Sequence, residues 1–134
     1  MSELSKVSRK AYTEEENLLA ARINAAITGK DSVLRDCLLL QNEPLPREGE
    51  TNRDGKQKCY YPDVLLFDQR SLLRFGVEAM GEGSKSDDFH RHQWLVEHGV
   101  IPLYFSNHEI KADMGLVMRT IRTRVQLGRL MLLG

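Results

Sequence analysis

The sequence predicts an α/β fold in which helices pack against a mixed β-sheet. Two short apolar segments, 59–67 and 72–80, are separated by only four polar residues, and this spacing favours an antiparallel hairpin. A helical pattern and another apolar segment, 100–105, follow, and such a strand, helix, strand passage favours a right-handed crossover between parallel strands. With helical patterns near both ends of the chain, the predicted order of elements is α-β-β-β-α-β-α.

The chain has 134 residues, a length that predicts one domain with one site. Residues 1–12 are polar and basic without a periodic apolar face, so we expect a flexible N-terminal arm before a single domain at 13–134. Thr13 and Glu16 have the spacing of a capping box, which predicts that a helix begins here. Gly29 is a typical helix stop, and the apolar residues before it recur at helical intervals: Leu18, Leu19, Ile23 and Ile27.

Residues 33–41 form a short apolar run whose length fits a strand but is ambiguous with a helix, and we expect a strand. Residues 42–58 contain two prolines, two glycines and many charges without periodicity. This composition predicts a long exposed loop, of the kind that often carries function.

The hairpin is followed by a segment, 81–86, whose glycines and serines predict a flexible loop. Ser86 or Asp87 can cap the next helix, which we expect to run to about His98 and to end at Gly99. This helix supplies the crossover between the second hairpin strand and the strand at 100–105.

A last helix is expected from Asn107 to about Gln126. Its apolar residues form one stripe: Ile110, Met114, Val117, Met118, Ile121 and Val125. No apolar run in the chain approaches the roughly 20 residues of a membrane-spanning helix, so we expect no membrane association.

Nineteen basic and nineteen acidic residues give a formal net charge of zero, which excludes a uniformly basic nucleic-acid-binding surface. Positive charge is nevertheless concentrated in two places. One place precedes the first hairpin strand and holds Arg53, Lys56 and Lys58; the other is the last helix, with Arg119, Arg122, Arg124 and Arg129. Such patches can contact phosphate, although for the helix a solvated face is the alternative.

The two cysteines, Cys37 and Cys59, are too few and too isolated for a zinc-ligand pattern, and no secretory signal precedes them. We expect reduced thiols that pack in the core. This expectation agrees with a cytoplasmic location.

Each strand of the predicted hairpin contains one acidic residue within its apolar run, Asp63 in the first and Glu78 in the second. A charge inside a core strand costs several kcal/mol unless it is paired or binds a metal. Carboxylates are the ligands that Mg²⁺ prefers, and a bound Mg²⁺ supports phosphodiester chemistry. Two carboxylates on adjacent strands therefore suggest a divalent-cation site; a solvated or salt-bridged pair is the alternative.

An ordered series of short motifs runs through the chain. It consists of Thr13 and Glu16, then Gln41, Pro62-Asp63, Glu78-Ala79-Met80-Gly81, Asp88-Phe89-His90-Arg91, Leu95, Gly99 and Phe105-Ser106-Asn107-His108-Glu109. In this order the chain resembles the PD-(D/E)xK nuclease superfamily, in particular the small endonuclease-like domains similar to the very-short-patch-repair endonuclease, over roughly residues 13–125. The resemblance implies a restriction-endonuclease-like α-β-β-β-α-β-α core with a mixed central sheet flanked by helices.

The same resemblance implies that Asp63 and Glu78 are catalytic metal ligands for Mg²⁺, with Mn²⁺ as a substitute, and that Glu16 is an auxiliary acid. The superfamily motif places a lysine two residues after the second acid, where this chain has Met80. A lysine there helps to activate the attacking water and stabilises negative charge. We expect Lys85, from the 81–86 loop, to take this role; otherwise the protein does not cut, and Lys85 is a solvated loop residue.

Arg53, Lys56 and Lys58 lead directly into the Asp63 strand, and Arg91 belongs to the Asp-x-x-Arg motif. We expect these four residues to contact DNA. Their role would be to neutralise phosphate charge and to position the duplex.

Three aromatic side chains of the helix before the last strand have a functional and a structural interpretation. His90 and His92 are alternative proton carriers, but on one helix they face different directions, so ordinary surface histidines are the simpler interpretation. Trp94 suits stacking on a base, but a Trp beside Leu95 is more often part of a core.

Taken together, the residues predict a metal-dependent DNA endonuclease of the PD-(D/E)xK type. Met80 favours an alternative, a catalytically inactive nuclease-fold module that binds DNA or a protein partner. A third possibility is a structural protein with incidental acids. A homodimer is compatible with each of these functions.

Overall fold

A computed structural model describes residues 13–41, 45–51, 55, 57–60, 62–81 and 87–133 of the chain; for residues 45–51, 57–60, 87–91 and 132–133 it describes the backbone alone. The predicted arm at residues 1–12 lies outside this range. The described part is an α/β structure with a mixed four-stranded sheet and helices packed against it, so the predicted fold class is confirmed at this level.

The first helix, α2 (Glu14–Thr28), begins where the capping box predicts. Thr13 N–H donates to Glu16 Oε1 at 2.8 Å, and Glu16 N–H donates to Thr13 Oγ1 at 3.2 Å. At the other end Gly29 is the C-cap, with φ −80°, and the left-handed conformation falls on Lys30, with φ 62°. The helix therefore begins and ends as expected, although the residue in the left-handed conformation is Lys30 and not Gly29.

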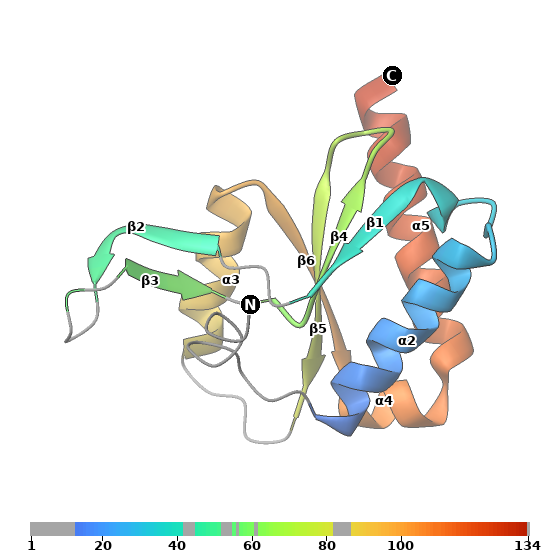
Figure 1. Cartoon of the computed structure of the whole chain (residues 1–134), viewed down its shortest axis with the longest axis horizontal. Helices are drawn as coiled ribbons and strands as arrows, with labels where there is room; N and C mark the ends of the chain where they lie inside the picture. Colours follow the sequence, from blue (N-terminus) through green and yellow to red (C-terminus); the bar gives the residue numbers. More distant parts are fainter. Residues whose placement is uncertain are drawn as a thin grey trace, which may run out of the picture.

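The main sheet has the strand order β1-β4-β5-β6, built from β1 (Cys37–Leu40), β4 (Val64–Asp68), β5 (Arg74–Met80) and β6 (Val100–Ser106). β4 pairs antiparallel with both β1 and β5, which confirms the hairpin. β5 and β6 are parallel, and helix α3 (Asp87–Glu97) lies between them in the chain, so the predicted parallel pair with an intervening helix is also confirmed. The mixed sheet stands at the centre of Figure 1, with α2 and α3 on opposite sides of it.

The segment between β1 and β4 departs from the prediction. The expected exposed loop at 42–58 instead contains two strands, β2 (Leu45–Thr51) and β3 (Gln57–Tyr60), which form an antiparallel ribbon that projects away from the main sheet (Figure 1). Pro46 pairs with Cys59 in this ribbon. A two-stranded ribbon has an open edge on each strand, so a proline is tolerated where a central strand would exclude it.

Three predicted strands are shorter than expected. The run at 33–41 begins with a 3₁₀ turn, Leu34–Asp36, before β1, because the Asp31 carboxylate accepts hydrogen bonds from the N–H groups of Val33 and Leu34 at 2.9 and 3.0 Å. The run at 59–67 is divided between β3 and β4, and Asp63 occupies a bend just before β4. The second strand of the predicted hairpin, expected to begin at residue 72, begins at Arg74.

The predicted last helix is two helices, α4 (Asn107–Ala112) and α5 (Met114–Leu133). The break falls at Asp113, whose φ of −149° leaves the helical range and whose Oδ1 accepts from Leu116 N–H at 3.1 Å. Asp113 therefore caps the start of α5. No helix in the described part of the chain is long and apolar enough to cross a membrane.

The sheet separates two apolar clusters. The larger cluster lies between the sheet and helices α2, α4 and α5, and it includes Val64 and Leu66 of β4 and Phe75 and Val77 of β5. The smaller cluster joins Leu65, Leu95 and Val100, with Trp94 against it, and so attaches α3 to the other face. Because side chains alternate along a strand, residues next to Val77 point toward the α3 face.

Candidate functional site

Asp63 and Glu78 lie opposite each other at the start of the β4–β5 hairpin. Val64 pairs with Val77, so the next residues outward along the two strands are Asp63 and Glu78. Asp63 N–H donates to Glu78 Oε2 at 3.4 Å, and Ala79 N–H donates to Asp63 Oδ2 at 2.7 Å. The two carboxylates therefore belong to one site, as the hairpin register predicts.

Both acids are removed from water. Asp63 is 2% exposed and Glu78 is 5% exposed. These values exclude the solvated pair that was one alternative for two strand carboxylates. An ionised carboxylate at such a position needs hydrogen bonds or a nearby cation, since burial without them costs several kcal/mol.

Gly76 lies near the Glu78 carboxylate and marks the face of the sheet on which it lies. A Cβ atom at Gly76 would lie 4.0 Å from Glu78 Oε2 and 3.1 Å from Val100 Cγ1. Val100 belongs to the cluster beneath α3, so the Glu78 side chain lies on the same face. Tyr104 is the register partner of Glu78 on the parallel strand β6.

Glu16 is in the first turn of α2 and is 9% exposed. One of its carboxylate oxygens accepts from Thr13 N–H at 2.8 Å, so this side chain holds the start of the helix. Glu16 is thus a buried acid with a structural role, and among the described residues it does not form a metal-holding group with Asp63 and Glu78.

Asp63 and Glu78 suit a hard cation by their chemistry. Mg²⁺ binds oxygen ligands and usually takes one or two protein carboxylates, with water and substrate phosphate completing its octahedral shell. Within the described residues no group of three or more Asp, Glu, His or Cys side chains is arranged to hold a metal ion. The donor set therefore fits a Mg²⁺ that shares its shell with substrate, and does not fit an ion enclosed by protein ligands.

The remaining predicted site residues have no described side chains. Lys85, Arg53 and Lys56 lie outside the described residues altogether. Lys58 is in β3 and Arg91 is in α3, each described by its backbone alone. Met80 ends β5 and is partly buried.

The arginines of the last helix do not form one basic patch. Arg122 Nε donates to Asp31 Oδ2 at 2.7 Å, and this ion pair is partly buried. Arg129 is 8% exposed and points into the protein. Only Arg119 and Arg124 of this set are exposed, so the idea of a phosphate-binding group on this helix is wrong for Arg122 and Arg129.

A buried polar cluster around Asp68 was not predicted. Arg129 Nε and Nη2 donate to the two oxygens of Asp68 at 3.0 and 2.8 Å, and Nη2 also donates to the Val33 carbonyl at 2.7 Å. Ser71 Oγ donates to Asp68 Oδ2 at 2.7 Å. The signal in the sequence was the helical stripe of Ile121 and Val125, because the next position of that stripe is Arg129.

The cluster shifts two titratable groups. Burial raises the pKa of Asp68, but the hydrogen bonds from Arg129, Ser71 and the Arg70 N–H outweigh it and lower the pKa to about 2. Burial, together with the Asp68 charge, raises the pKa of Cys37 to about 12. Cys37 is 1% exposed, which confirms the expected core thiol, and it is a poor nucleophile because it stays protonated.

Helix α3 presents its aromatic residues in two ways. Trp94 stacks on His98 with ring centroids 3.9 Å apart and packs against the small cluster, so the core interpretation of Trp94 is confirmed. His92 is exposed and its Nδ1 lies 2.9 Å from Tyr104 Oη on β6. His90 has no described side chain.

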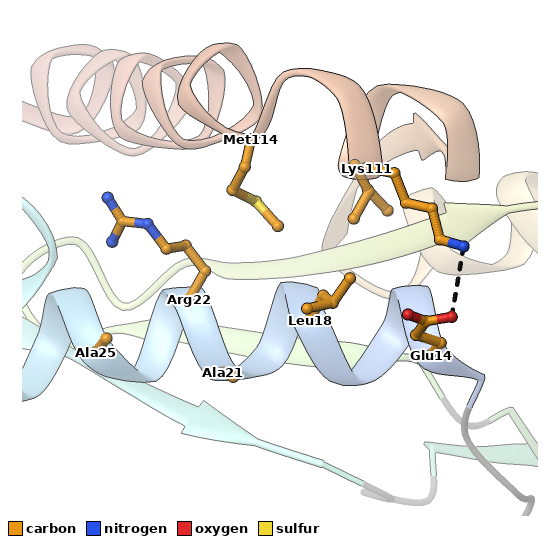
Figure 2. A pocket seen from close by; sticks show the side chains of 8 residues that line it. Glu14, Leu18, Ala21, Arg22, Ala25, Lys111 and Met114 are labelled. Atoms are coloured by element: carbon orange, nitrogen blue, oxygen red, sulfur yellow. Dashed lines mark ion pairs between the residues drawn. The ribbon is translucent and has the colours of Figure 1, made fainter.

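A groove of about 600 Å³ lies elsewhere, between α2 and the α4–α5 pair. Figure 2 shows Leu18 and Met114 facing each other across it, with Arg22 toward one end and the ion pair of Lys111 and Glu14 toward the other. None of the predicted site residues lines this groove. It is separate from the acidic site, which is on the α3 face of the sheet.

The structure thus brings together Asp63 and Glu78, as the residues predict. The nuclease family itself rests on the motif order alone. Comparisons of the chain with protein-family models, with curated proteins and with solved structures found no match, so the resemblance to PD-(D/E)xK nucleases stays a prediction.

Proposed function

We propose that this protein is a metal-dependent DNA endonuclease that hydrolyses phosphodiester bonds, with Asp63 and Glu78 as its Mg²⁺ ligands. The proposal is carried by one observation: two buried acids face each other across a strand pair, and Glu78 Oε2 is 3.4 Å from the backbone nitrogen of Asp63. Two negative charges confined to one site repel each other, and a divalent cation between them relieves that repulsion.

The backbone prepares these acids for the role. Ala79 N–H donates to one oxygen of Asp63 at 2.7 Å, and Asp63 N–H donates to one oxygen of Glu78 at 3.4 Å. When bound, Mg²⁺ would polarise the scissile phosphate and help to generate the attacking hydroxide. In this proposal Glu16 is the auxiliary acid of the site and Lys85 replaces the motif lysine.

DNA would reach the acids along the β2–β3 ribbon and the start of α3. The ribbon ends three residues before Asp63, and Lys58 is in its second strand. We assign phosphate contacts to Arg53, Lys56, Lys58 and Arg91, each of which would add to a salt-dependent affinity.

Met80 favours a second function, a nuclease-fold module that binds DNA or a protein without cutting. A thioether cannot donate a proton or carry a positive charge at the position where the motif places an ammonium group. In this alternative the buried acids stabilise the strand pair, and DNA binding requires no divalent cation.

The test compares the parent with Asp63→Asn and Glu78→Gln, which keep the size of the side chains. Supercoiled plasmid and single-stranded DNA are incubated with Mg²⁺ or Mn²⁺, and cleavage is followed on gels. We expect each variant to lose at least about 100-fold in rate, since even groups that only orient metal ligands contribute 10–100-fold. Glu97→Gln is the matched control, because Glu97 is an exposed acid at the end of α3.

Calorimetric titration with Mg²⁺ separates the two functions. The endonuclease binds Mg²⁺ at millimolar concentration and loses this binding in Asp63→Asn. Full cleavage by a folded Asp63→Asn protein would exclude the assignment. A parent protein that binds DNA but neither binds Mg²⁺ nor cuts is the binding module.

A further inference from the structure

A histidine and a tyrosine meet on the α3 face of the sheet, beside the acidic site. His92 Nδ1 and Tyr104 Oη are 2.9 Å apart, and the ring centroids are 5.6 Å apart with an interplanar angle of 30°. The residues come from different elements, α3 and β6, and both are accessible to solvent, Tyr104 at 36%. One nitrogen of the imidazole is thus held by Tyr104, and this contact sets the direction of the other nitrogen.

Tyr104 connects this pair to Glu78. The two residues are register partners in the parallel pairing of β5 and β6, so their side chains leave the sheet on the same face. Neighbouring strands are about 4.8 Å apart, so the Tyr104 side chain on β6 lies next to Glu78, the proposed metal ligand on β5. Helix α3 packs on this face through Leu95, three residues after His92.

We propose that His92, oriented by Tyr104, donates a proton to the leaving oxygen during phosphodiester hydrolysis; this inference rests on the endonuclease function proposed above. Such a group is needed because the alkoxide that leaves when a phosphodiester bond breaks is a strong base and must be protonated. Histidine is the side chain that most readily carries a proton near neutral pH. Tyr104 is a positioning residue, because it acts through the imidazole ring.

The proton balance of the step is as follows. The water oxygen bonds to phosphorus while the bond between phosphorus and the leaving oxygen breaks, and the attacking water releases its proton to solvent. His92 begins as the imidazolium, with Nδ1–H donating to Tyr104 Oη, and it transfers its Nε2 proton to the leaving oxygen. The neutral ring keeps its Nδ1–H bond to Tyr104 and recovers a proton from solvent before the next turnover.

The experiment compares two substrates whose leaving groups differ in their need for a proton. Plasmid DNA expels an alkoxide, which must be protonated, whereas bis(4-nitrophenyl) phosphate expels a stabilised phenolate, which need not be. His92→Gln should reduce plasmid cleavage about 10²–10⁴-fold, the usual contribution of a general acid. It should change hydrolysis of the nitrophenyl ester by less than about 3-fold, because the proton donor contributes little there.

Tyr104→Phe should give a smaller loss on plasmid, about 10-fold, and should add nothing to His92→Gln in the double variant, as expected of two residues that act as a unit. His98→Gln is the matched control, since His98 is an exposed histidine at the end of the same helix and bonds to the Trp94 carbonyl. Circular dichroism establishes that each variant is folded, and calorimetry establishes that His92→Gln still binds Mg²⁺.

Three results would overturn the inference. The first is that His92→Gln cuts plasmid at the parent rate, and the second is that it loses equal activity on both substrates. The third is that adding Tyr104→Phe to His92→Gln lowers plasmid cleavage further. In each case the parent still binds Mg²⁺ and cuts, so the endonuclease function stands. A parent protein that neither binds Mg²⁺ nor cuts removes the proposed function and this inference together.

Discussion

Arg129 connects the end of α5 to the main sheet through hydrogen bonds, and replacing it should destabilise the protein severely. The guanidinium makes three hydrogen bonds, two to Asp68 at 3.0 and 2.8 Å and one to the Val33 carbonyl at 2.7 Å. Arg129→Met keeps most of the apolar stem and removes all three. Asp68, which is 0% exposed, is then left as a buried carboxylate without a cationic partner, and its remaining donors are Ser71, the Arg70 N–H and the Cys37 thiol.

Removing one partner of a buried ion pair typically costs about 3–5 kcal/mol, and we expect a loss of this size. The pKa of Asp68 gives a check. Its value of about 2, compared with 3.8 for an ordinary aspartate, corresponds to about 2 kcal/mol of net stabilisation of the ionised form. The two figures agree in order of magnitude. The second is smaller because it already includes the cost of burying the charge.

Urea unfolding at pH 7, followed by circular dichroism, measures the loss. Arg124→Met is the control, because Arg124 is exposed on the same helix, and it should change the free energy of unfolding by less than about 0.5 kcal/mol. The double variant Asp68→Asn/Arg129→Met should lose less than the sum of the single variants. If Arg129→Met lowers the free energy of unfolding by less than about 1 kcal/mol, this ion pair is not a major source of stability and the reasoning is refuted.

The same pair predicts how stability changes in acid. The pKa of Asp68 is lower in the folded protein than in the unfolded chain, so its contribution is fully present above about pH 4 and is lost as the pH falls toward 2. The difference in stability between the parent and Arg129→Met should therefore narrow over this interval. A difference that stays constant from pH 5 to pH 2 would contradict the ionised state of Asp68.

Three further predictions concern packing, capping and thiol chemistry. Gly128→Ala should change the free energy of unfolding by less than about 0.5 kcal/mol, because the new Cβ would lie 2.7 Å from Leu73 Cδ1 and the shift of that flexible side chain offsets the gain in helix propensity. Gly115→Ala in the same helix should instead stabilise the protein by up to about 1 kcal/mol, because the nearest neighbour of the new Cβ is an Asp113 oxygen at 3.6 Å. Equal changes for the two variants in thermal unfolding would contradict this account of both glycines. Ser106→Ala should cost about 1 kcal/mol by removing the 3.0 Å hydrogen bond that caps α4, measured by urea unfolding; no loss would mean that the cap is dispensable. Cys37, whose pKa is raised to about 12, should resist iodoacetamide at pH 8 in the native protein and react after unfolding, as mapped by peptide mass spectrometry, whereas rapid native alkylation would show that the thiol is accessible.

Features with a local physical cause were predictable from the sequence. The capping box of Thr13 and Glu16 acts over three residues, and the β4–β5 hairpin follows from a short polar connection between two apolar runs. The facing of Asp63 and Glu78 follows from that hairpin. These elements could be placed because each depends on neighbours in the sequence.

Features that depend on distant partners were missed. Asp68 and Arg129 are 61 residues apart, and no local pattern pairs a turn aspartate with a helix arginine. The β2–β3 ribbon lacks the alternation of apolar residues that identifies a strand, since it pairs without belonging to the main sheet. The division of the last helix depends on Asp113, whose capping bond to Leu116 outweighs the continuous apolar stripe on both sides of it.

The contacts of Asp63 and Glu78 have a consequence for how this fold can evolve. Each acid binds a backbone N–H at the β4–β5 junction, so each helps to join the strands whether or not DNA is cut. Selection for folding alone would therefore retain both acids in a lineage that has stopped cutting. Position 80 has no such contact among those described here, and one nucleotide change converts a methionine codon into a lysine codon. A lysine at position 80 is thus one mutational step away, with both acids unchanged.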